Sequence, residues 1–150
     1  MKPLVRYRAG YRFQLAEPFQ CATPVVEACP GNHFVGLAAD GTLTIAAGYA
    51  WDGASGPIAQ GPDIVRGSLV HDALYQLMRE CGLSTTWRGA ADDLLRVVFV
   101  EDGMHPLMAG IAHGAVRAFG ERFVNPIHAR PVLVAPAPVT YPSTAEWIAP

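Results

Sequence analysis

The hydrophobic pattern of this chain changes its period once, close to Pro62, and this change constrains the fold more than any other feature. In LVRYRAGYRFQL, residues 4–15, apolar and basic residues alternate, which is typical of a half-buried strand or pair of strands. From Asp63 onward, apolar residues recur at the spacing of an amphipathic helix. We therefore expect an α+β fold, with a β layer over residues 1–47 followed by helices.

The β layer contains a predicted antiparallel hairpin. It spans HFVGLAADGTLTIAAG, residues 33–48, with Asp40-Gly41 at its centre. This dipeptide favours a tight turn because both residue types tolerate the backbone angles that such turns require.

Start and stop signals divide residues 63–120 into three predicted helices. The first follows Pro62 and ends near Gly82, where a C-terminal cap is expected. The second starts at Ser84 or Thr85 and runs to Glu101. The third runs from His105-Pro106 to Gly120 and is rich in small residues, which permits close approach of a neighbouring helix.

The remaining residues, 124–150, are predicted to form an extended arm on a single domain that spans residues 1–123. Six of the thirteen prolines lie in this segment, so most of it cannot be helical. Its content of Val, Leu, Tyr, Trp and Ile is too apolar for an ordinary disordered tail. We expect the arm to lie against its own domain or against a partner.

Composition narrows the class of protein. With 150 residues, 51% of them hydrophobic, the chain can bury one core. A net charge of -2 does not favour nucleic-acid binding, and no apolar run approaches the length of a membrane span. The three cysteines form no CxxC motif, so we expect free thiols and synthesis in a reducing cytoplasm, with a Cys21–Cys29 bridge as the less favoured alternative.

Polar residues stand out in three places. The glycine-rich loop GYAWDGASGP, residues 48–57, carries Asp52 and Ser55, and the first predicted helix carries the pair His71-Asp72. In the second helix, Arg88 and Asp92 are four residues apart and can pair on one edge. The same spacing places His71 and Tyr75 on one face of the first helix.

These residues support two catalytic hypotheses. In the first, a divalent metal such as Zn, Mn or Mg activates water for hydrolysis. Its ligands are Asp52, His71, Asp72 and Asp92. A triad of Ser55, His71 and an aspartate is the other arrangement that this composition allows, but the Gly-x-Ser-x-Gly pattern is missing.

The alternative is a buried structural network. In this hypothesis Asp52 caps the helix that begins near residue 63 or accepts bonds from its own turn. His71 then bonds to Asp52 or to Asp92 and connects the loop to the helices. The sequence leaves open whether these residues form a catalytic site or a structural network.

The three motifs, taken in order, resemble a phage and prophage family called domain of unknown function 1353. That family shows a Gly-aromatic-x-x-Asp-x-x-Ser-x-Pro loop, a His-Asp-x-Leu-Tyr helix and an Arg-x-x-Ala-Asp helix. The matching positions, within residues 33–120, are Gly48, Tyr49, Asp52, Ser55, Pro57, His71, Asp72, Leu74, Tyr75, Arg88, Ala91 and Asp92. Trp51 departs from the pattern, and the Pro-rich arm lies outside the shared region.

The resemblance implies a phage-encoded protein. We expect a virion structural or assembly component, associated with the tail, that is made in the host cytoplasm and docks through its arm on other phage structural proteins or on copies of itself. In this function, structural roles are expected for Gly48, Tyr49, Pro57, Tyr75 and Arg88. The alternative function is a metal-dependent hydrolase that acts in host entry, lysis or defence evasion.

Overall fold

The computed structural model describes residues 5–7, 11–54, 58–129 and 133–135, and side chains are described for 11–54 and 58–129. Ser55 and Pro57, which the sequence singles out, lie outside the described residues. The chain divides into two compact units. One is the body, residues 10–129, and the other combines residues near the two ends of the chain.

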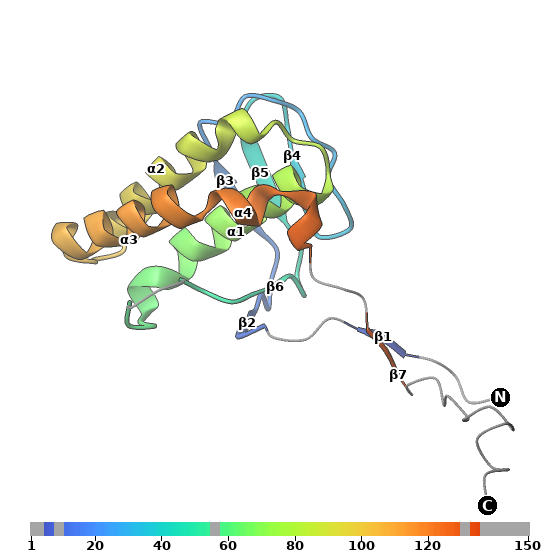
Figure 1. Ribbon diagram of the computed structural model, residues 1–150, viewed down its shortest axis with the longest axis horizontal. Coiled ribbons are helices and arrows are strands. Elements are labelled where there is room, and N and C mark those ends of the chain that lie inside the picture. The colour runs from blue at the N-terminus through green and yellow to red at the C-terminus, as the bar shows by residue number, and fades with distance from the viewer. Residues whose placement is uncertain (1–4, 8–10, 55–57, 130–132, 136–150) are drawn as a thin grey trace, which may run out of the picture. The chain divides into compact units, whose positions relative to one another are not determined.

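The elements follow the predicted order of strands and then helices (Figure 1). In chain order they are β1 Val5–Tyr7, β2 Phe13–Gln14, β3 Phe19–Ala22, β4 Val35–Leu37, β5 Thr42–Ile45, β6 Ala50–Trp51, η1 Pro62–Ile64, α1 Val65–Glu80, η2 Thr85–Trp87, α2 Arg88–Glu101, α3 Pro106–Phe119, α4 Glu121–Val124, η3 Pro126–His128 and β7 Leu133–Ala135. The α+β class expected from the sequence is confirmed.

The β layer of the body is antiparallel. Its main sheet has the strand order β3-β5-β4, and β2 pairs with β6 separately. The predicted hairpin is β4 and β5, with Leu37 opposite Leu43. Gly41 has a φ of 88°, a conformation that glycine adopts without a steric penalty, and Asp40 Oδ1 accepts a bond from the Thr42 amide at 2.9 Å.

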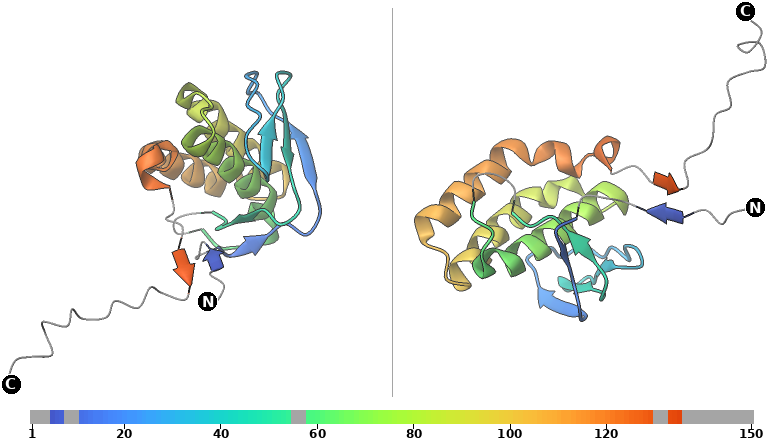
Figure 2. Two further views of the ribbon diagram at one scale, coloured as in Figure 1. Left: turned by 90° about the vertical axis from the view of Figure 1, so that its right-hand side faces the viewer. Right: turned by 90° about the horizontal axis from the view of Figure 1, so that it is seen from below.

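The helices form a layer beside this sheet. Figure 2, left view, shows α1 between the strands and the α3–α4 segment. Contacts join α1 to β4, α2 and α4, and join α2 to α3. A core between the sheet and α1 contains Leu43, Ile45, Leu74 and Leu77, and a second core between η1, α2 and α3 surrounds Phe99.

The helix boundaries follow the predicted signals. Gly82 has a φ of 81°, and the Leu83 amide donates to the Leu77 carbonyl at 3.2 Å, which satisfies the end of α1. Ser84 caps η2 by accepting from the Thr86 amide. At the helix near residue 63 the N-cap is Gly61, which makes no side-chain capping bond, so the suggestion that Asp52 caps this helix stays a prediction.

The second unit contains a two-stranded ribbon. Strand β1 pairs antiparallel with β7, with Val5 opposite Ala135 and Tyr7 opposite Leu133. The first strand of the chain therefore pairs with the predicted arm and not with the β layer of the body. The start of the predicted arm, residues 124–129, belongs to the body and includes η3.

The α1–α2 contact predicts a sharp cost for one added methyl group. A Cβ at Gly67 would overlap the ring of Phe99, which is fully buried. We expect Gly67→Ala to lower the free energy of unfolding by about 1–3 kcal/mol, because the packed ring has to shift. Chemical denaturation measures this change.

Gly110→Ala is the matched control, since a Cβ at Gly110 in α3 meets nothing within 4 Å. It should leave stability unchanged or raise it by about 0.5–1 kcal/mol through helix propensity. Equal effects of the two substitutions would contradict the packing described for Gly67.

Candidate functional site

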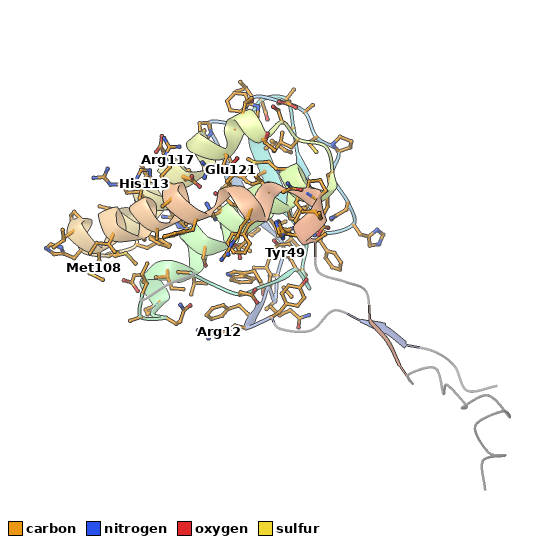
Figure 3. The ribbon with its side chains drawn as sticks, viewed as in Figure 1. Arg12, Tyr49, Met108, His113, Arg117 and Glu121 are labelled. Atoms are coloured by element: carbon orange, nitrogen blue, oxygen red, sulfur yellow. The ribbon has the colours of Figure 1, made fainter. Side chains whose placement is uncertain are left out.

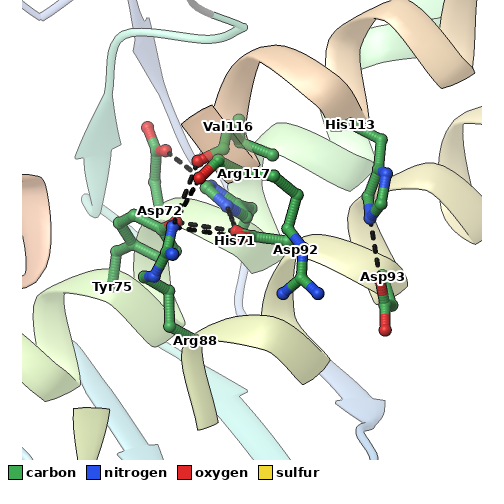
Figure 4. Close-up of polar contacts among 9 residues, drawn as sticks. All are labelled: His71, Asp72, Tyr75, Arg88, Asp92, Asp93, His113, Val116 and Arg117. Atoms are coloured by element: carbon green, nitrogen blue, oxygen red, sulfur yellow. Dashed lines mark hydrogen bonds and ion pairs between the residues drawn. The ribbon is translucent and has the colours of Figure 1, made fainter. Parts of the chain in front are cut away.

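The candidate site is centred on Asp92, an acidic side chain of α2 with no exposed surface (Figure 4). His71 Nε2 lies 2.9 Å from Asp92 Oδ1, and the Tyr75 hydroxyl donates to the same oxygen at 2.7 Å. His71 and Tyr75 both come from α1, and their rings are 4.0 Å apart between centroids. One carboxylate therefore joins α2 to two successive turns of α1.

Arg88 extends this network to a third helix. It lies one turn before Asp92 on α2, and its Nη1 is 3.5 Å from Asp92 Oδ2. The same nitrogen donates to the carbonyls of Val116 and Arg117, each at 3.3 Å. These carbonyls belong to the last turn of α3, where the helix dipole favours a cation.

His71 lies between two carboxylates. Its Nε2 faces Asp92, and its Nδ1 is 3.7 Å from Asp72 Oδ1, an ion-pair distance. His71 is buried, whereas the Asp72 side chain is one-third exposed. The imidazole thus bridges an internal acid and an acid at the surface.

The pKa shifts of His71 and Asp92 favour the charged form of both side chains. Burial lowers the pKa of His71, but the hydrogen bonds and charges of Asp72 and Asp92 outweigh burial and raise it. Burial raises the pKa of Asp92, but the bonds from His71 and Tyr75 outweigh burial and lower it. We infer a His71 cation hydrogen-bonded to an Asp92 anion. Burial and the bond to Asp92 also raise the pKa of Tyr75.

The glycine-rich loop reaches α1 through its aromatic residues. Trp51 Nε1 donates to Ser68 Oγ at 3.1 Å, and Ser68 lies one turn before His71. Tyr49 is buried beside Trp51, and burial together with the charge of Asp72 raises the pKa of Tyr49. Figure 3 labels Tyr49, which directly precedes β6, close to the helices. Gly53 has a φ of 80° and turns the chain directly after this anchor.

Of the residues that the sequence singled out, the structure brings together His71, Asp72, Tyr75, Arg88 and Asp92. The contacts described for His71 run to Asp72 and Asp92, so of its two proposed partners the structure shows Asp92. Asp52 follows Trp51 and is partly buried.

Sequence analysis missed two contributions to the site. Ser68 was not singled out, although its spacing of three and seven from His71 and Tyr75 places it on the same face of α1. The contact of Arg88 with the α3 carbonyls was also missed. No sequence pattern signals that contact, because it depends on how α2 packs against α3.

The described residues around Asp92 show no metal centre. Among them, no group of three or more His, Cys, Asp or Glu is arranged to hold one. Asp92 already accepts bonds from His71 and Tyr75 and faces the Arg88 cation, so a metal would have to displace these partners. The prediction of a metal site at Asp52, His71, Asp72 and Asp92 stays a prediction.

Comparison with known proteins leaves the family open. No family model matches the sequence, and no curated protein or solved structure matches the chain. Over the described residues, no helix is both long enough and apolar enough to cross a membrane.

Neighbouring aspartates of α2 provide a test of the network. Asp92→Ala should lower the free energy of unfolding by about 3–5 kcal/mol, because it leaves buried His71 and Arg88 without their shared anion. Thermal and chemical unfolding measure the loss, and metal analysis of the same samples should show no metal lost with the carboxylate.

Asp93→Ala is the matched control. Asp93 is bonded to His113 at 2.7 Å, but its side chain is 65% exposed, so we expect a change within about 0.5 kcal/mol. A stable Asp92→Ala variant that has lost a bound metal would instead identify the cluster as a metal site.

The network also predicts how stability depends on pH. The raised pKa of His71 means that its contribution is fully present below its ordinary value of 6.5 and is lost as pH rises through the folded-state value. The lowered pKa of Asp92 means that its contribution is lost as pH falls below its ordinary value of 3.8.

Stability should therefore decline as pH rises above 6.5, the ordinary pKa of histidine, and His71→Gln should flatten this decline. His33→Gln, at an exposed position, is the control and should preserve it. If stability rises over this range in the unmodified protein, the charged state inferred for His71 is wrong.

Proposed function

We propose that this chain is a structural or assembly component of a phage or prophage particle, associated with the tail. In this proposal the body, residues 10–129, is a rigid module. The C-terminal arm docks on a neighbour, which is another phage structural protein or a copy of this chain. The proposal rests on the sequence motifs together with two features of the fold.

The first feature, which carries the proposal, is that the polar network lies inside the body and joins three helices. Asp92 is fully buried, and its partners come from α1 and α2, while Arg88 also holds the end of α3. A general base or a metal ligand needs a free lone pair directed at a substrate or ion. Here Asp92 Oδ1 accepts from both His71 and Tyr75, while Oδ2 makes no hydrogen bond and faces the Arg88 cation at 3.5 Å, inside the body. Such an arrangement is suited to fixing helix packing.

An open hollow on the body surface lies elsewhere. Its lining residues are Ala118, Phe119, Glu121, Arg122, Asn125 and His128, from the end of α3 through η3. None of the network residues lines it.

The second feature is the β1–β7 ribbon. It has two strands of three residues each. A two-stranded ribbon of this size is marginally stable by itself in water, so it gains from adding a strand or a surface of another molecule. Pairing also joins residues 133–135 of the arm to residues 5–7 near the N-terminus.

Truncation tests the proposal. A chain that ends at Ala129 keeps every described element of the body, including η3. We expect it to fold with an unfolding temperature close to that of the full chain. In the phage or prophage that encodes it, however, it should be missing from purified particles by immunoblot or mass spectrometry.

The full-length His113→Gln variant, expressed at the same level, is the control and should be incorporated normally. Normal incorporation of the truncated chain would contradict docking through the arm. Absence of the full-length protein from particles would contradict the virion role itself.

A further inference from the structure

Helix α3 has the composition of a helix that is covered on all sides. All of its fourteen residues except His113 and Arg117 are nonpolar. Within the described part of the chain, however, only Ala109 and Ala112 are buried. A helix that is apolar around its whole circumference normally lies inside a protein. The apolar surface of α3 therefore exceeds what its contacts in the body cover.

The two polar side chains of α3 mark the flank that faces α2. His113 Nε2 lies 2.7 Å from Asp93 of α2, and the guanidinium of Arg117 lies over Gly89 of α2. Figure 3 labels both residues on the same helix as Met108. With about 100° of rotation per residue, the flank that contains Gly114 and Ala118 lies about a third of a turn around the helix from His113 and Arg117, and it carries no charge.

This outward flank has a regular spacing. Its residues follow one another at intervals of four, three and four, which is the spacing of a coiled-coil seam. They are Leu107, Ile111, Gly114 and Ala118. All four are exposed, with Leu107 at 67% and Ile111 at 47%. A Cβ at Gly114 would meet nothing within 4 Å, so the space beside this glycine is free to receive a side chain of another molecule. We call this space the hole at Gly114. We call these four residues the α3 seam.

The seam is ordered by size along the helix. Its first two residues are large and its last two are small. We propose that the α3 seam binds the α3 seam of a second copy of this chain in an antiparallel, two-fold symmetric pair. Leu107 then packs on the partner's Ala118, and Ile111 fills the hole at the partner's Gly114.

Symmetry makes each contact occur twice, so each copy supplies both the projecting side chains and the holes that receive them. Large residues facing small ones fill the space between helices at native density. A parallel pair would place Gly114 against Gly114 and leave a void, so the size order selects the antiparallel arrangement.

Charge agrees with this arrangement. Glu101 and Asp102 precede α3 and share the single cation of Arg66, which leaves the start of α3 net acidic. The other end carries exposed Arg117, Glu121 and Arg122, which together leave one net positive charge. Antiparallel pairing brings Arg122 of one copy toward the acidic end of the other, and it also aligns the two helix dipoles favourably.

The seam suits a protein partner better than a membrane surface. Helices that lie on membranes carry several Lys or Arg residues along their polar face. The charged side chain of α3 is Arg117, and the whole chain has a net charge of -2. A helix pair of this length buries on the order of 1,000 Å², the lower limit for a specific interface, so the dimer should depend on concentration.

Sedimentation velocity of the full chain between ~1 and ~100 µM tests the proposal. The unmodified protein should pass from monomer to dimer with increasing concentration. Ile111→Glu should remain monomeric because it places a charge in the seam. Val26→Glu is the control, since Val26 is 62% exposed in the loop between β3 and β4, and it should dimerise normally.

Gly114→Leu separates shape from general hydrophobicity. It makes the seam more apolar and favours helix formation, yet it fills the hole that receives Ile111. We expect it to fold and to remain monomeric. The double variant Ile111→Ala with Gly114→Leu exchanges the large and small positions and should restore the dimer.

Three results would overturn the proposal: a monomer at every concentration, dimerisation of Gly114→Leu equal to that of the unmodified chain, or binding of the monomer to phosphatidylcholine–phosphatidylglycerol vesicles through the seam. These results are independent of the arm. The docking function fails if truncation at Ala129 leaves particle incorporation intact, whereas the seam fails if Ile111→Glu leaves the dimer intact.

Discussion

The packing of the helices depends on one buried carboxylate. Asp92 has no exposed surface, and a charge in that position is stable because a cation and a hydroxyl from α1 and a cation from α2 surround it. Since Arg88 also binds the last carbonyls of α3, the same group fixes three helices. A displacement of α1 would separate Asp92 from His71 and Tyr75, and a displacement of α3 would separate Arg88 from the α3 carbonyls.

This constraint extends to the β layer through α1. Ser68, one turn before His71, receives the indole N–H of Trp51, so the loop between the sheet and the helices is fixed to the same helix that carries the network. Gly48 and Gly53, both at positive φ, turn the chain, while Tyr49 and Trp51 enter the core. The body is thus a connected unit in which the β layer and the helices are joined through α1.

Local signals were sufficient to predict much of this structure. Asp40-Gly41, Pro62, Gly82 and Ser84 act within a few residues, so the hairpin and the helix boundaries followed from the sequence. Spacing of four residues correctly paired Arg88 with Asp92. What the sequence could not provide were contacts between distant segments, such as β1 with β7, Trp51 with Ser68 and Arg88 with α3, because these depend on tertiary packing.

The central claim is that a His71 cation and an Asp92 anion form the centre of the body. Nitrogen NMR of the ring of His71 in labelled protein tests it most directly, with the other four histidines as references in the same spectra. The account predicts that the pKa of the His71 ring lies above its ordinary value of 6.5, and that the ring keeps both protons below that pH, with a slowly exchanging proton on Nε2. A neutral His71 ring at pH below 6.5 would contradict it.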